Sequence, residues 1–172
     1  LGDPSGIGFE VILKTFEDKK IFDLVTPIVF ANTENFSVER EKLGLKTNII
    51  ILQNINKHEE GQLNVIKTWD QPFKIVYGKE QDEAGIISIR SLDAALKALK
   101  HKLIDVLVTA PINKKSIQSN SFKFPGHTDY LSQKLDGKSL MFMISKAIKI
   151  ALVTDHIPLS QIATYLNSDI IE

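Results

Sequence analysis

The chain contains no cysteine among its 172 residues, so disulfide bonds, thiolate catalysis and cysteine-ligated metal sites are excluded. It also lacks an excess of either charge, because 21 lysines and arginines balance 21 aspartates and glutamates. That balance argues against nucleic acid as a partner but leaves room for a local basic pocket that binds a small anion. No apolar run is long enough for a transmembrane helix, and no signal peptide is visible, so we expect no membrane partner.

Apolar runs of strand length alternate along the chain with helical patterns. Strands are predicted over residues 24–31, 48–52, 104–109 and 148–154, and helices over residues 8–20, 83–102 and 129–135 and after Pro158. Residues 54–77 are less regular and indicate short strands, which could form a hairpin arm. Continuous apolar strands that alternate with helices are typical of an α/β fold with a mostly parallel sheet.

Both ends of the sequence look interrupted. Residues 1–3 open directly on a loop motif, where a preceding strand would be expected, and residues 159–172 stop inside or just after a helical pattern. We therefore expect a fragment of a longer protein.

The first motif that could carry chemistry is G-D-P-S-G-I-G-F-E, at residues 2–10. Its glycines let the backbone approach a ligand closely, and the helix N-terminus that follows favours an anion. The spacing is neither that of the dinucleotide-binding fingerprint nor that of a Walker loop. The alternative is a tight turn in which Ser5 caps the helix.

A second motif, residues 108–115, lies at the carboxyl end of a predicted buried strand, where ligands bind in open α/β sheets. Thr109, Asn113 and Lys114 could contact a phosphate or carboxylate there, or could lie in an ordinary solvated loop. A third motif, residues 124–130, places His127 and Thr128 at a helix start. His127 could bind a hydroxyl or phosphate or transfer a proton, whereas Thr128 could simply cap the helix.

The fourth motif, residues 153–159, places His156 after another predicted strand. A neutral imidazole there could bind a metal. One histidine is not a metal site, however, and partners at metal-ligand spacing are absent. His58 and His101 lie in polar surroundings and are expected to be solvated.

Taken together and in this order, the four motifs resemble the 4-hydroxythreonine-4-phosphate dehydrogenase family of the vitamin B6 pathway. The family pattern G-D/E-P-A/S-G-I-G-P-E is met by residues 2–10, except that Phe9 replaces proline. The family's T-A/G-P-V/I-N/H-K, G-H-T-D/E and T-x-H-I/L-P-L segments are met by residues 109–114, 126–129 and 154–159. The resemblance covers all of this chain but only about the first half of a typical member.

This resemblance implies an α/β fold like that of isocitrate and isopropylmalate dehydrogenases, with two domains around a cleft. Residues 1–122 would belong to the first domain, and residues 123–172 would begin a second domain that is incomplete here. It further implies a cytoplasmic homodimer whose active sites are shared between subunits, with NAD and a divalent metal (Zn, Mg or Co) as cofactors. The small phosphorylated substrate, 4-(phosphooxy)-L-threonine, is oxidised to a 3-keto acid that decarboxylates to 3-amino-2-oxopropyl phosphate.

By resemblance, His127 and Thr128 match the family's substrate-binding pair, and His156 matches its first metal-binding histidine. Lys114 is a candidate for phosphate binding or proton transfer in catalysis. The remaining metal histidines and most cofactor contacts are expected in the missing half, so no cofactor-binding residue is assigned, and the fragment alone is expected to be inactive.

Three other functions remain open. A dehydrogenase of a phosphorylated threonate or erythronate would keep the same motifs, and only a substrate panel would distinguish it. A phosphate acyltransferase would need neither NAD nor metal. A non-catalytic binding module, or an inactive remnant, would lack the second half altogether.

Overall fold

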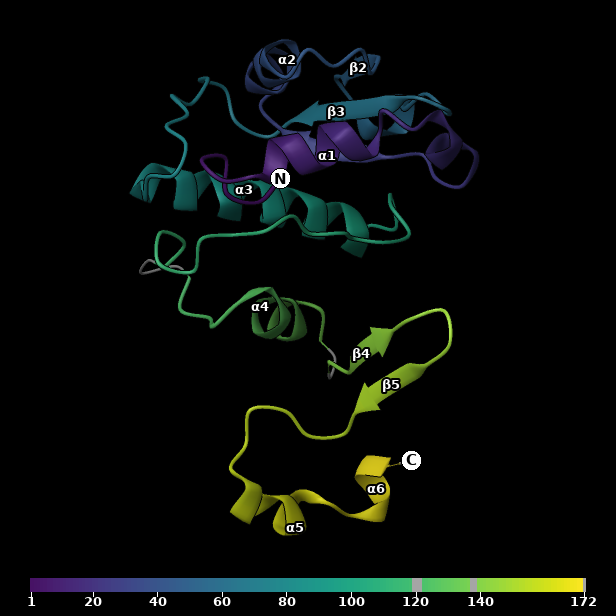
Figure 1. Ribbon diagram of the computed structural model, residues 1–172, viewed down its shortest axis with the longest axis vertical. Helices are drawn as coiled ribbons and strands as arrows, with labels where there is room; N and C mark the ends of the chain where they lie inside the picture. Colours follow the sequence, from purple (N-terminus) through teal and green to yellow (C-terminus); the bar gives the residue numbers. More distant parts are fainter. Residues whose placement is uncertain (119–121, 137–138, 172) are drawn as a thin grey trace. The chain divides into compact units, whose positions relative to one another are not determined.

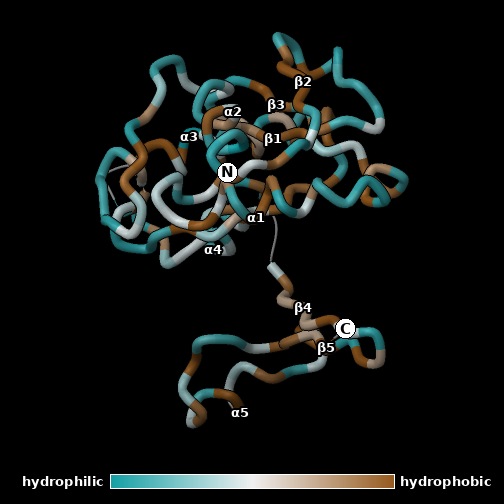
Figure 2. Tube along the Cα trace, turned by 45° about the horizontal axis from the view of Figure 1, so that its top comes forward, coloured by the Kyte–Doolittle hydropathy of each residue, from teal (hydrophilic) through white to brown (hydrophobic). Residues whose placement is uncertain are grey.

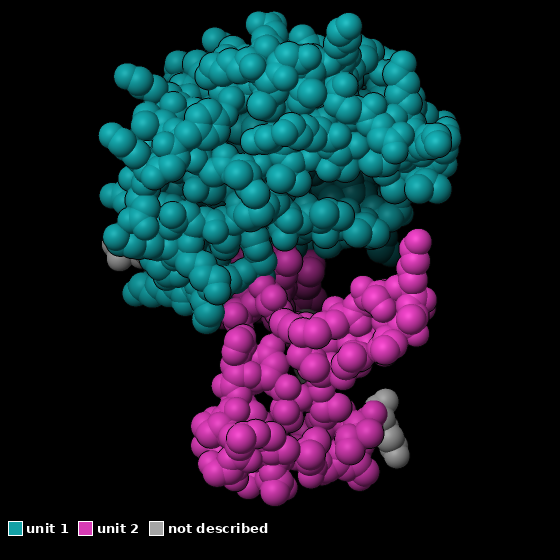
Figure 3. All heavy atoms as spheres, in the orientation of Figure 1, with its two compact units in different colours: residues 1–127 teal, residues 128–172 magenta. Residues whose placement is uncertain are grey.

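The computed structural model describes residues 1–118, 122–136 and 139–171. The chain divides into two compact units, residues 1–127 and residues 128–172, shown in different colours in Figure 3. The division of the complete protein into domains between residues 122 and 123 stays a prediction. No helix in the described ranges is both long and apolar enough to cross a membrane.

The first unit is built on a parallel sheet (Figure 1). Its strands lie in the order β1-β3-β2 and comprise β1 (Ile28–Ala31), β2 (Ile49–Leu52) and β3 (Leu63–Lys67). The helices of this unit are α1 (Gly8–Thr15), η1 (Lys19–Asp23), α2 (Thr33–Lys42), η2 (Ile55–Lys57) and α3 (Asp82–Lys100), where η denotes a 3-10 helix. The predicted parallel α/β architecture is confirmed for this unit.

Helices cover both faces of the sheet because successive side chains of a strand point in opposite directions. Val29 and Ala31 of β1 lie in a buried cluster with Phe9 of α1 and Phe36 of α2. Phe30, between them, lies in a second cluster with two alanines of α3. The continuous apolar run of this strand is therefore explained by burial on both sides.

The long helix α3 falls within two residues of its predicted bounds. Its buried residues recur at helical spacing, for example Ala84, Ile87, Ser88 and Leu92. The predicted helix over residues 8–20 is shorter in the structure and ends at Thr15. The Asp18 side chain accepts a hydrogen bond from the backbone N–H of Lys20 and starts the 3-10 turn of η1 instead.

Two predicted elements differ in the structure. The hairpin arm expected within residues 54–77 is wrong, because β3 lies between β1 and β2 and runs parallel to both. The strand expected over residues 104–109 is not formed, because these residues make no ladder with any described segment. Its Val106 and Val108 side chains are 71% and 86% exposed. A strand requires a partner, and the described residues offer none at this position.

The second unit follows the start of α4 (His127–Lys134). Its other elements are the strands β4 (Met141–Ile144) and β5 (Lys149–Leu152), η3 (Leu159–Gln161), α5 (Ile162–Tyr165) and α6 (Ser168–Ile171). The strand predicted over residues 148–154 is present as β5, but it pairs antiparallel with β4. Pro158 precedes a 3-10 turn rather than starting an α-helix directly.

The β4–β5 hairpin is rich in exposed apolar side chains. Phe142, Ile144 and Ile150 are 54%, 69% and 49% exposed. Figure 2 shows hydrophobic colour along both strands. An apolar hairpin that buries so little of its surface is typical of a segment that is covered by another part of a protein or by a partner.

Candidate functional site

The first and second motifs meet in the first unit. The backbone N–H of Asp3 donates to the carbonyl oxygen of Pro111 at 2.8 Å. At Gly2, a Cβ atom would lie 2.0 Å from that same oxygen, so only glycine allows the two loops to come this close. The glycine-rich loop is therefore in backbone contact with the loop that follows residue 109.

Ser5 anchors the glycine-rich loop to the start of α3. It is buried, and its hydroxyl lies 2.7 Å from the side-chain oxygen of Gln81, the residue before that helix. The backbone N–H of Gly78 donates to the Ser5 carbonyl at 3.2 Å. The alternative that Ser5 caps α1 is wrong, because the cap residue is Ile7 and no side chain caps that helix. The Ser5 hydroxyl instead forms a hydrogen bond with the side chain of Gln81.

The loop after residue 109 is folded by Asn113. Its side-chain oxygen accepts hydrogen bonds from the backbone N–H groups of Lys115 and Ser116, at 2.9 and 3.1 Å. The turn lies directly against α3, because a Cβ at Gly85 would be only 1.8 Å from the Ser116 carbonyl oxygen. Asn113 thus shapes this turn, and contact of its side chain with a phosphate or carboxylate stays a prediction.

An exposed ion pair joins this turn to the segment before α3. The Lys115 ammonium lies 2.7 Å from a carboxylate oxygen of Glu80. Hydrogen bonding between them lowers the pKa of Glu80 and raises that of Lys115. Because both groups are solvated, this pair orients the turn more than it stabilises the fold.

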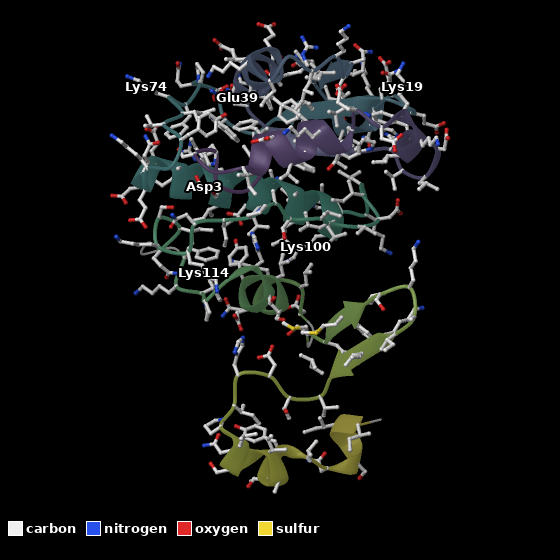
Figure 4. The ribbon with its side chains drawn as sticks, viewed as in Figure 1. Asp3, Lys19, Glu39, Lys74, Lys100 and Lys114 are labelled. Atoms are coloured by element: carbon white, nitrogen blue, oxygen red, sulfur yellow. The ribbon has the colours of Figure 1, made fainter. Side chains whose placement is uncertain are left out.

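Lys114 lies in the same turn and is exposed, as is Thr109. Figure 4 labels Lys114 together with Asp3 of the glycine-rich loop. An ammonium group and a hydroxyl at the rim of two adjoining loops can donate hydrogen bonds to a phosphate or carboxylate. The structure thus brings Lys114 and the glycine-rich loop into one region of the first unit.

His127 is the first residue of α4 and is half-buried. Burial lowers the pKa of its imidazole. A neutral imidazole can both donate and accept a hydrogen bond. Thr128 is exposed within the first turn of α4, so its predicted role as the cap of a helix over residues 129–135 is wrong.

His156 lies in the second unit, and its side chain is 93% exposed. Its Nε2 atom is 3.6 Å from a carboxylate oxygen of Asp155. Its backbone has φ of +53°, a left-handed conformation that is uncommon for a residue with a side chain. Among the described residues, no three potential ligands gather into a metal-binding group. A site that joins His156 and Thr128 to Lys114 stays a prediction, because those two residues belong to the other unit.

Sequence reasoning missed the residues that support the two loops, namely Glu80, Gln81 and Gly85. One signal was available for the last of these. A glycine inside a strong helical pattern often marks close approach of another backbone, and Gly85 interrupts the pattern of α3.

Comparison with known proteins follows the same motifs. The profile of the pyridoxal phosphate biosynthetic protein PdxA family matches residues 23–172. A 4-hydroxythreonine-4-phosphate dehydrogenase of Bacteroides thetaiotaomicron is 39% identical over 99% of this chain and 48% of its own length. A D-threonate 4-phosphate dehydrogenase of Cupriavidus necator is 28% identical over 92% of this chain and 49% of its own length. The chain thus spans about half the length of these curated relatives.

The fold is shared with a solved structure. The 4-hydroxythreonine-4-phosphate dehydrogenase of Burkholderia phymatum superposes with a TM-score of 0.87 over 99% of this chain and 52% of its own, at 21% sequence identity. At that identity the likeness concerns the fold alone. Since the family profile covers most of the sequence and the fold agrees with it, this chain belongs to the PdxA family of pyridoxal phosphate biosynthetic proteins.

Proposed function

We propose that the complete protein is an NAD-dependent dehydrogenase of 4-(phosphooxy)-L-threonine in vitamin B6 biosynthesis, acting in the cytoplasm. The secondary alcohol gives a hydride to NAD and a proton to a base, and the resulting 3-keto acid loses carbon dioxide to yield 3-amino-2-oxopropyl phosphate. The observation that carries this proposal is the family match over residues 23–172, together with the four motifs.

A second substrate has specific support. One relative that matches 92% of this chain is named a D-threonate 4-phosphate dehydrogenase. Both substrates are phosphorylated hydroxy acids that differ in the amino group, so the loops described above would suit either. The stronger identity to the relative from Bacteroides thetaiotaomicron, 39% against 28%, favours phosphothreonine.

Three side chains are assigned to the substrate. His127 and Thr128 hold the phosphorylated alcohol. Burial lowers the pKa of His127 and so favours the neutral imidazole, which can both donate and accept a hydrogen bond. Lys114 is exposed in the turn that follows Pro111, the residue that contacts the glycine-rich loop, and its ammonium can bind the phosphate or take part in proton transfer.

His156 is proposed as one ligand of a divalent metal, either zinc, magnesium or cobalt. Its exposed imidazole can reach a metal, but with Asp155 it supplies at most two donors, so further ligands must come from outside the described residues. A bound divalent cation would polarise the substrate hydroxyl and stabilise charge that develops on decarboxylation. NAD supplies the redox chemistry, and no residue of this chain is assigned to it.

We further propose that the complete protein has two α/β domains around a cleft, as in isocitrate and isopropylmalate dehydrogenases, and forms a homodimer with shared sites. The exposed apolar side chains of the β4–β5 hairpin support an interface of this kind. In the same proposal, this half by itself has no dehydrogenase activity.

The test uses the full-length protein. NAD reduction would be followed with 4-(phosphooxy)-L-threonine and with D-threonate 4-phosphate, and metal content would be measured by elemental analysis. We expect the unsubstituted protein to turn over 4-(phosphooxy)-L-threonine. In His156→Ala we expect loss of the metal and a decrease in kcat/KM of at least about a hundredfold. The matched control is His101→Ala, which removes an exposed histidine outside the four motifs.

The outcomes separate the alternatives. Turnover of the threonate substrate alone would transfer the assignment to that dehydrogenase class. Absence of NAD reduction with either substrate would overturn the dehydrogenase proposal, and full metal content in His156→Ala would overturn the role of that histidine.

A further inference from the structure

Two adjacent lysines in the turn after Pro111 have different surroundings. The Lys115 ammonium lies 2.7 Å from a carboxylate oxygen of Glu80. The Lys114 side chain is exposed and forms no ion pair with any residue in the described ranges. Within this part of the chain, the turn thus has one ammonium that a carboxylate neutralises and one that is open to an anionic ligand.

Glu80 also reaches the residue that shapes the turn. Hydrogen bonds from the side chains of Lys115 and, to a smaller extent, Asn113 lower the pKa of the Glu80 carboxyl group. The Asn113 side-chain oxygen in turn accepts hydrogen bonds from the backbone N–H groups of Lys115 and Ser116. One carboxylate therefore binds the turn on both sides of Lys114.

The segment that carries Glu80 is itself held at both ends. On one side, the Tyr77 hydroxyl donates to the carboxylate of Glu39, a buried residue of α2. On the other side, the side-chain oxygen of Gln81 accepts a hydrogen bond of 2.7 Å from Ser5, and α3 begins at the next residue. Glu80 can therefore serve as a fixed anchor, whereas a carboxylate on an unattached loop would move with the lysine.

The ion pair between Glu80 and Lys115 contributes little to folding. The Lys115 and Glu80 side chains are 82% and 51% exposed, and exposed ion pairs stabilise proteins only slightly. A lysine side chain has many rotamers, so a turn without this pair could present either ammonium to a ligand. The consequence of the pair is therefore the choice of lysine that the turn presents.

We propose that Glu80 is a positioning residue, which holds Lys115 and thereby presents Lys114 as the ammonium that binds the phosphate of the substrate. This inference rests on the proposed role of Lys114 in the complete protein. Glu80 does not itself contact the phosphate, because two anions repel each other at short distance. Loss of its carboxylate should weaken substrate binding through the turn alone.

The experiment uses the full-length protein and compares Lys114→Ala, Glu80→Gln and the exchanged pair Glu80→Lys with Lys115→Glu. In Glu80→Gln we expect KM for 4-(phosphooxy)-L-threonine to rise about five- to tenfold, whereas KM for NAD changes by less than about twofold. Lys114→Ala should raise the same KM at least as much. The exchanged pair should restore it to within about threefold of the unsubstituted value, because an ion pair of reversed polarity again holds the turn.

The matched control is Glu83→Gln, which removes an exposed carboxylate from the first turn of α3 and should leave both KM values unchanged. The Tm of Glu80→Gln should stay within about 2 °C of the unsubstituted protein. A larger fall in Tm would assign the ion pair to folding and would overturn the proposal.

Three kinetic results would also overturn it. A lower KM in Glu80→Gln would show that Lys115, once released, is the better phosphate contact. An unchanged KM in this variant would show that the turn needs no anchor, and an exchanged pair without recovery would show that the ion pair is not the cause.

A measurement without turnover separates this inference from the proposed function. If the protein reduces no NAD with either substrate, the affinity for inorganic phosphate can still be measured by NMR titration of the Lys115 and Ser116 amides. Binding weakened by about threefold or more in both Lys114→Ala and Glu80→Gln would support the positioning role. Equal affinity in these variants and the unsubstituted protein would overturn it.

Discussion

Asp3 and Pro111 are joined by a 2.8 Å hydrogen bond between their backbones, although nearly the whole of the first unit separates them in sequence. This bond makes one structural feature out of the first two motifs. The loop after residue 109 lies close to the glycine-rich loop because Gly2 has no side chain to hold it away.

The contact at Gly2 predicts that Gly2→Ala destabilises the first unit. A Cβ there would lie 2.0 Å from the Pro111 carbonyl oxygen, and backbone on both sides would have to move. We expect the free energy of unfolding to fall by about 2–4 kcal/mol in urea titrations. Gly126→Ala is the matched control, because no atom lies within 4 Å of its Cβ position. If Gly2→Ala lowers the free energy of unfolding no more than Gly126→Ala does, the loops that contain Gly2 and Pro111 can move apart without cost.

Gly85→Ala tests the contact between the turn and α3, where two effects have opposite signs. Alanine favours a helix over glycine by about 1 kcal/mol. The new Cβ would, however, lie 1.8 Å from the Ser116 carbonyl oxygen. We expect the clash to dominate, with a net loss of about 2 kcal/mol or more in unfolding free energy. A more stable variant would contradict the close approach.

Asn35 holds the segment that leads from β3 toward Gly78. Its amide exchanges two hydrogen bonds of 2.8 Å with the backbone of Phe73, and both residues are buried. Asn35→Ala would leave a buried N–H and a buried carbonyl without partners, which should cost about 2–4 kcal/mol in chemical denaturation. Asn48→Ala, which removes an exposed side-chain hydrogen bond to Gln62, should cost less than about 0.5 kcal/mol.

His127 predicts a pH dependence of stability. Burial lowers its pKa in the folded state, so the unfolded chain binds a proton at higher pH than the folded chain does. Stability should be fully present above the unfolded value near 6.5 and should be lost as the pH falls from there toward the folded pKa. In urea titrations, the free energy of unfolding should fall less between pH 7 and pH 5 for His127→Gln than for the unsubstituted protein. Titration by NMR at or above the ordinary value would contradict the prediction.

The left-handed backbone at His156 predicts that a glycine variant is more stable than an alanine variant at this position. With φ of +53°, a Cβ costs about 1 kcal/mol that glycine does not incur. His156→Gly should therefore be about that much more stable than His156→Ala in thermal unfolding. If alanine is the more stable of the two, the strain at this position is absent in solution.

The sequence by itself determined the elements that depend on local pattern. The stripe of α3 and the apolar run of β1 predicted their elements because burial imposes a period on the side chains. The four motifs marked the family in the same local way. Where a short-range hydrogen bond competes with periodicity, as at Asp18 in the first predicted helix, prediction from the pattern failed.

Only the tertiary structure decided how the strands pair and which loops meet. The central place of β3 depends on segments distant in sequence. The antiparallel pairing of β5 with β4, and the lack of a partner for residues 104–109 among the described segments, were likewise not encoded in hydropathy. The same holds for Ser5. From the sequence its hydroxyl could hydrogen-bond at the start of α1 or elsewhere, whereas in the structure it lies 2.7 Å from the side-chain oxygen of Gln81. The local pattern of apolar residues determines whether a segment can form a helix or a strand. Its place in the fold depends on the hydrogen-bond partners that its buried backbone and side-chain groups require.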